Sequence, residues 1–222
     1  MGRIAHDTWS SIIGVFYLGL MTNVLLALGC LPLLVLLVTT DPAYSWPLLA
    51  VAAPLCAPAL AAAFATYRAH ANGENSVIVT FAKAWRAVAW KALAIGLAAT
   101  ALVVILFVDV RMLADSALSV VAVPLLLVLA VVVVSTALVA LVALSEAPQA
   151  LLRDILKASL YLSVRRWYLS LISLAVFGVQ AALFTGMPAF ALGLTAAPAL
   201  YVAWANSRYI LRPVLDLGDV VA

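Results

Sequence analysis

The sequence predicts an all-α fold, a polytopic membrane helix bundle with about six transmembrane helices and amphipathic cytoplasmic segments. Three observations predict this fold class. Hydrophobic residues make up 68% of the chain and charged residues 9%, whereas charged residues are about 25% of soluble domains. The charged residues occur in clusters, with apolar runs between them. These runs are long enough to cross a bilayer, because a helix rises about 1.5 Å per residue and roughly 20 apolar residues span the hydrocarbon core.

The apolar runs predict six spans within a single integral membrane domain that covers residues 1–222. We expect these spans at residues 12–39, 46–67, 90–108, 117–144, 168–185 and 188–206. The last two come from one apolar stretch that is too long for a single helix. Gly186 and Pro188 lie in the middle of that stretch, and both residue types interrupt helices. The stretch is therefore expected to form a tight helical hairpin.

The basic residues predict the orientation of the chain. Six spans put both termini on one side, and a cytoplasmic N-terminus then leaves only Arg111 outside. The other eleven basic residues fall on the cytoplasmic side: Arg3, Arg68, Lys83, Arg86, Lys91, Arg153, Lys157, Arg165, Arg166, Arg208 and Arg212. This bias follows the positive-inside rule. It predicts a multi-pass protein with both termini in the cytoplasm, with the lipid bilayer as a partner and no nucleic acid partner.

Two inner connections carry amphipathic sequence. Val77, Phe81 and Trp85 recur at helical spacing, with basic residues on the other face, and a second stripe includes Ile155 and Leu162. Interfacial helices and cytoplasmic extensions of spans three and five both fit these segments. If a partner protein binds, we expect it on a face made by these segments. That face would comprise Phe81, Lys83, Trp85, Arg86, Arg153, Ile155 and Lys157.

Few polar residues are expected inside the hydrocarbon, and none of them is ionisable. Asn23 and Gln180 are the most costly to leave unpaired in lipid. They would serve either as intramembrane polar contacts for a substrate or as hydrogen-bonding partners between helices, and we favour the second interpretation. Cys30 and Cys56 are expected at similar depth, facing each other as free thiols.

Motifs for catalysis are missing from the sequence. It contains no nucleophile elbow, P-loop or dinucleotide-binding fingerprint, and two cysteines cannot build a tetrahedral zinc site. We therefore expect a protein that is not an enzyme. The sequence offers no candidate catalytic, cofactor-binding or metal-binding residue and implies no cofactor.

A short internal similarity links spans two and six. Residues 57–60 (Ala-Pro-Ala-Leu) recur at 197–200, and Phe64 and Arg68 correspond to Trp204 and Arg208 at the same offset. We favour chance similarity in an Ala-rich chain, and the trace of an internal repeat, as many transporters have, is the alternative.

Residues 10–95 resemble the YesL-like family of bacterial membrane proteins, which has no established activity. The resemblance is carried by Asn23, Leu25-Leu26, Leu31-Pro32, Ala57-Pro58-Ala59-Leu60-Ala61-Ala62, Gly73-Glu74, Phe81 and Trp85. It implies a location in the bacterial cytoplasmic membrane. Because members are often encoded beside carbohydrate ABC importers, it also implies an accessory role in carbohydrate transport, with a transporter subunit as partner.

Two further functions compete with this expectation. A small solute carrier or exporter that acts by itself is the main alternative, and the proline-rich second span favours it. The absence of charged residues at mid-membrane depth opposes it. An intramembrane enzyme ranks last, because the sequence offers no nucleophile, base or metal set.

Overall fold

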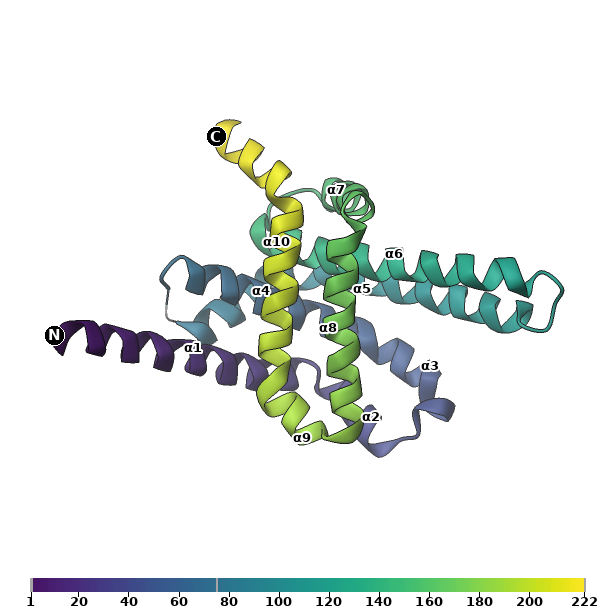
Figure 1. Ribbon diagram of the computed structural model, residues 1–222, viewed down its shortest axis with the longest axis horizontal. Coiled ribbons are helices and arrows are strands. Elements are labelled where there is room, and N and C mark those ends of the chain that lie inside the picture. The colour runs from purple at the N-terminus through teal and green to yellow at the C-terminus, as the bar shows by residue number, and fades with distance from the viewer. Residues whose placement is uncertain (1, 75, 222) are drawn as a thin grey trace.

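The computed structural model describes residues 2–74 and 76–221, with the side chains of residues 14–74 and 76–214. The side chain of Arg3 lies outside these ranges. The helices are α1 (Gly2–Gly29), α2 (Leu31–Thr39), α3 (Pro42–Ala52), η1 (Ala53–Cys56), α4 (Ala57–Ala71), α5 (Val77–Leu113), α6 (Ser119–Glu146), α7 (Leu152–Arg165), α8 (Trp167–Gly186), α9 (Pro188–Phe190), η2 (Ala191–Thr195) and α10 (Ala196–Val221) (Figure 1).

The described residues form helices and no strand. Within them, five helical segments are long and apolar enough to cross a bilayer, and the bent pair α1–α2 makes a sixth if it is counted as one broken span. Large apolar side chains on α6, such as Val120, Val121 and Leu125, are exposed, as expected for a surface that faces lipid. The chain is therefore a polytopic membrane helix bundle, as the sequence predicted.

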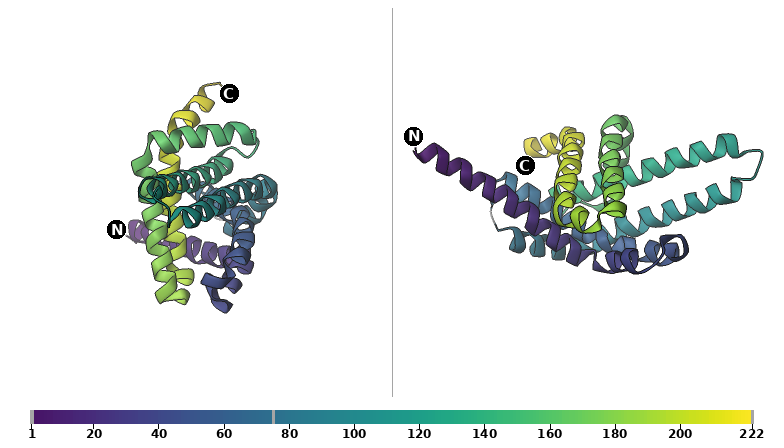
Figure 2. Two further views of the ribbon diagram at one scale, coloured as in Figure 1. Left: turned by 90° about the vertical axis from the view of Figure 1, so that its right-hand side faces the viewer. Right: turned by 60° about the horizontal axis from the view of Figure 1, so that its bottom comes forward.

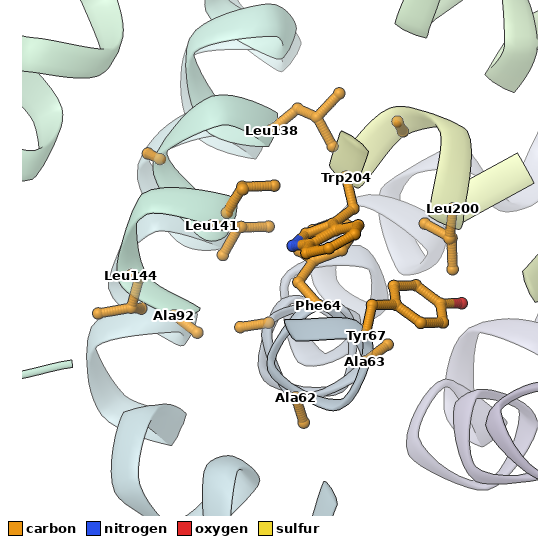
Figure 3. Packing of buried hydrophobic residues seen from close by; sticks show 14 of the residues in the cluster. Ala62, Ala63, Phe64, Tyr67, Ala92, Leu138, Leu141, Leu144, Leu200 and Trp204 are labelled. Carbon is orange, nitrogen blue, oxygen red and sulfur yellow. The ribbon is translucent and has the colours of Figure 1, made fainter. Parts of the chain in front are cut away.

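The Ala-rich helix α4 lies at the centre of the bundle. Its residues from Ala57 to Tyr67, apart from Leu60, are buried, and it packs against α1, α5, α6 and α10. Small side chains let helix backbones approach closely, which is a common basis of helix packing in membranes. Figure 3 shows Phe64 and Tyr67 of α4 beneath Trp204 of α10, with Leu141 of α6 to the left of Trp204 and Leu138 above it.

The structure does not contain one continuous helix over residues 12–39. The helix ends at Gly29, α2 begins at Leu31, and the two axes differ by 76°. Pro32 explains the break, since it has no N–H and would clash with the carbonyl four residues earlier in an unbroken helix. Here it lies in the first turn of α2, where a missing N–H costs nothing.

The other expected spans correspond to helical segments of the structure. Span two is α3, the 3₁₀ turn η1 and α4 in succession, and span six is α9, the π-helical turn η2 and α10. The connection after α4 turns at Gly73, whose φ of +88° is readily adopted only by glycine. This turn allows α5 to begin at Val77 and run back along α4.

Two helical hairpins cross each other in the bundle. Helices α5 and α6 form one and α8 and α10 form the other, and the two hairpins run at a steep angle to each other in Figure 1 and in the right-hand view of Figure 2. The marked chain ends and α7 lie toward the left and top of Figure 1. The α5–α6 turn, α2 and α9 lie toward the right and bottom.

The two amphipathic segments have different structures. The first is the beginning of α5, which continues without a break to Leu113, so it is an extension of span three. The second forms a separate helix, α7, which ends at Arg165 before α8 begins at Trp167. Lys91 links the two regions, because its Nζ donates to the carbonyl oxygens of Pro148 (2.7 Å) and Ala150 (3.0 Å) between α6 and α7.

Candidate functional site

Asn23 of α1 interrupts the backbone hydrogen bonding of span six. Its Nδ2 donates to the carbonyl oxygen of Gly193 at 2.8 Å, and its Oδ1 accepts from the N–H of Ala197 at 2.6 Å. In a regular α-helix these two backbone groups, four residues apart, would bond to each other. The buried carboxamide therefore sits between them, at the junction of η2 and α10.

Gln180 of α8 holds the other side of the same turn. Its Nε2 donates to the carbonyl oxygen of Ala191 at 2.8 Å, and its Oε1 accepts from the Thr195 hydroxyl at 2.8 Å. Tyr67 of α4 adds a third contact, because its hydroxyl donates to the carbonyl oxygen of Ala197 at 3.1 Å. We call residues 191–197 with Asn23, Gln180 and Tyr67 the π-turn cluster.

In the structure, Asn23 and Gln180 both make hydrogen bonds between helices. Both amides have their oxygen and their nitrogen bound to span six. The sequence singled out both residues but gave no sign that they meet at one segment. A cavity of about 480 Å³ lies beside the cluster, and Asn23 is the one polar side chain among its described lining residues. The remainder of the lining is apolar and includes Phe16, Leu20, Leu194 and Pro198.

The expected partner face is only partly exposed. Phe81 and Ile155 are 7% and 5% exposed and belong to the hydrophobic core, so the expectation that a partner protein contacts them is wrong for these two residues. Their periodicity reflects burial against the bundle, since an amphipathic helix packs its apolar stripe inward wherever a core is available. The other five residues of the face are exposed: Lys83, Trp85, Arg86, Arg153 and Lys157.

The exposed residues of this face also belong to two helices with different neighbours. The helix α5 packs on α4 and α6, whereas α7 packs on α6, α8 and α10. The outward side of α7 carries its own exposed set, with Leu160, Tyr161 and Val164 each about half exposed or more. The Arg165 guanidinium lies 5.9 Å from the centre of the Tyr161 ring. We call Lys157, Leu160, Tyr161, Val164 and Arg165 the α7 ridge. A shallow hollow lies between the side chains of these five residues.

Sequence reasoning missed a charged cluster at the end of α6. Arg68 of α4 donates from Nη1 to the backbone oxygen of Glu146 at 2.7 Å. Arg208 of α10 forms an ion pair with the Glu146 carboxylate, with 3.6 Å between Nε and Oε1. Arg68 and Arg208 are the matching residues of the internal similarity, which was the one available signal. We call the end of the bundle that holds this cluster and α7 the basic end.

The two cysteines lie against each other across the bend. Cys30 connects α1 with α2, Cys56 ends η1, and the two side chains are in contact. Both are free thiols, as expected. Among the described residues, no group of three or more His, Cys, Asp and Glu side chains is placed to hold a metal ion.

Both thiols are expected to resist a membrane-impermeant maleimide added to intact cells. Cys56 is buried and Cys30 is half-buried, so a reagent that stays in the aqueous phase has little access to either thiol. Mass spectrometry of the purified protein after labelling measures the modified fraction. Rapid labelling of either cysteine from outside would contradict the buried position and would indicate an open aqueous path to the bend.

Comparison with known proteins gives one family match. The family model described as "Protein of unknown function, DUF624" matches residues 19–110. This segment is less than half of the chain. It runs from Asn23 through the bend at Cys30 and the central helix α4 into α5, and it overlaps the region that resembles the YesL-like family. No curated protein and no solved structure matches the chain.

Proposed function

We propose that this chain is a non-enzymatic protein of the bacterial cytoplasmic membrane, with both termini in the cytoplasm, that acts by binding a transporter at its basic end. The transporter class that we propose is a carbohydrate ABC importer. That choice rests on the resemblance to the YesL-like family, and the family match over residues 19–110 is compatible with it.

The observation that carries this proposal is that both intramembrane amides are already hydrogen-bonded within the protein. A carrier needs polar groups at membrane depth that can exchange bonds with a solute. Asn23 and Gln180 are instead bound to the backbone and side chains of span six. The exposed charged and aromatic side chains at α7 lie at one end of the bundle, where they are accessible to a second protein.

The α7 ridge is the surface that we propose for the transporter subunit. It combines exposed aromatic and aliphatic side chains with two basic residues, and aromatic residues and arginine are enriched in protein interfaces. The buried stripe of α7, which includes Ile155 and Leu162, fixes the helix to the bundle. The ridge therefore presents its side chains from a rigid support.

Site-specific crosslinking tests this proposal. A photoreactive amino acid in place of Tyr161 is expected to crosslink to a permease or ATPase subunit of an importer when the protein is expressed at its native level. The same group in place of Leu125, which is also exposed but lies on α6, is the control and should crosslink to lipid only. A Tyr161 product without any transporter subunit would contradict the proposal.

A solute carrier that acts by itself is the second candidate, and one observation favours it. Three spans are interrupted, at the Cys30 bend, at η1 and at η2, and discontinuous helices are common at transporter binding sites. Purified protein in liposomes separates the two functions. Uptake of maltose, sucrose or sorbitol by the protein alone, and its loss in Asn23→Ala, would favour the carrier. Impermeable vesicles would favour the partner.

A further inference from the structure

A cavity of about 740 Å³ lies between the ends of α4, α6 and α10. Three arginines line it, Arg68, Arg208 and Arg212, together with Glu146, Trp204 and Tyr209. Ligand pockets in proteins commonly have volumes of about 300–1,000 Å³. The cavity is thus large enough for a small molecule or a lipid headgroup, and it is distinct from the α7 ridge.

Positive charge predominates in this cavity. Among its described lining residues, three guanidinium groups face a single carboxylate. That carboxylate belongs to Glu146, whose side chain is 7% exposed, and its Oε1 has no hydrogen-bond partner among the described residues. The nearest positive group is Arg208, at the long ion-pair distance of 3.6 Å. Such a pair leaves most of the five N–H donors of a guanidinium available.

Aromatic rings orient the arginines around the cavity. The Arg208 guanidinium lies over the Trp204 ring at 5.4 Å, and that of Arg212 lies over the Tyr209 ring at 5.7 Å. Arg166 approaches Tyr209 from the junction between α7 and α8, at 5.2 Å from the ring, and donates from Nη1 to the Tyr209 carbonyl at 2.7 Å. Arg68 is fixed by its bond to the Glu146 backbone. The guanidinium groups are therefore held in place before any ligand binds.

We propose that this cavity binds a phosphate group through Arg68 and Arg208. Guanidinium groups match the geometry of phosphate oxygens with paired N–H donors, and two or more arginines balance a phosphate better than one. Basic pockets between membrane helices on the cytoplasmic side recognise the headgroups of anionic phospholipids. A soluble phosphate ester offers the same chemistry, so the test includes both sources.

The test uses the full chain, purified in a neutral detergent. Cardiolipin is titrated and followed by intact-protein mass spectrometry, and inorganic phosphate and glucose 6-phosphate are titrated by calorimetry. We expect saturable binding of one ligand per chain in at least one arm. Arg68→Gln and Arg208→Gln should each weaken it about tenfold or more, the effect of losing one charge-assisted hydrogen bond. The matched controls Arg153→Gln and Arg165→Gln remove the same charge outside the cavity and should change binding less than about twofold.

Each outcome bears on the proposal. Binding of cardiolipin alone identifies a lipid headgroup site, and binding of a soluble ester identifies a metabolite site. Equal weakening of binding by all four Arg→Gln variants would mean that only the net charge of the protein matters, and it would overturn the proposal. The absence of saturable binding in both arms would also overturn it. Arg208→Lys keeps the charge on a partly exposed side chain and guards against a folding defect. It should bind several-fold more weakly than the wild type, because an ammonium group cannot present the paired donors.

Discussion

Gly96→Leu is expected to lower the unfolding free energy of the bundle by about 3 kcal/mol, the upper part of the usual range for overpacking. A Cβ at Gly96 would lie 2.8 Å from the Cβ of Ala57 and 3.1 Å from the carbonyl oxygen of Pro54. Backbone atoms cannot rotate away as a side chain can. Helix α5 would therefore have to move off η1 and the start of α4. Thermal unfolding in detergent, monitored by size-exclusion chromatography, measures the loss of stability.

Gly178→Leu is the matched control for this prediction, since a Cβ at that position meets nothing within 4 Å. It should change stability by less than about 0.5 kcal/mol. A second close approach allows a rescue, because a Cβ at Gly29 would lie 2.5 Å from the Cβ of Ala59. Gly29→Ala should destabilise, and adding Ala59→Gly should restore most of the stability. Equal effects of Gly96→Leu and Gly178→Leu would show that α5 does not contact α4 as described.

Asn23→Ala is expected to lower stability by about 1–3 kcal/mol, the cost of leaving buried polar groups unpaired. The variant removes the carboxamide that separates the Gly193 carbonyl from the Ala197 N–H. Those two groups can then pair directly only if the π turn rewinds into a regular helix. Thermal unfolding measures the change, and Gln149→Ala, at an exposed amide, is the control with little expected effect.

Gln180→Ala should interact with Asn23→Ala, because both side chains hold the same turn. Once the turn has rewound, the contacts of Gln180 with Ala191 and Thr195 are already weakened. The double variant should therefore lose less stability than the two single losses together, with a coupling of about 0.5–3 kcal/mol. Strict additivity would mean that the two amides act on independent parts of the structure.

The membrane fold was predictable from the sequence because its signals are local. Apolar runs of sufficient length define spans regardless of what they pack against, and the Gly186–Pro188 break correctly separated α8 from α9 and α10. The bend at Cys30 was harder to predict. Pro32 is compatible both with a mild kink inside a membrane helix and with the first turn of a new helix, and packing decides between them.

The site depended on contacts between distant segments, which periodicity does not reveal. The stripe with Phe81 and the stripe with Ile155 were correctly placed on helices, but a stripe does not say whether it faces lipid, a partner or the protein core. Nothing in the sequence distinguishes Glu146, and only the fold places it in contact with Arg68 and Arg208. The similarity between residues 57–68 and 197–208, which we attributed to chance, includes both arginines but does not predict that they lie close together.

The central claim is that the basic end of the bundle faces the cytoplasm, because both the transporter contact and the phosphate site depend on it. The direct test compares two exposed positions, Asn72→Cys after α4 and Asp115→Cys between α5 and α6. The measurement is labelling with an impermeant maleimide in intact and permeabilised cells, with the wild type as the unlabelled background. We expect Asp115→Cys to label in intact cells and Asn72→Cys only after permeabilisation. Labelling of Asn72→Cys in intact cells would contradict the account.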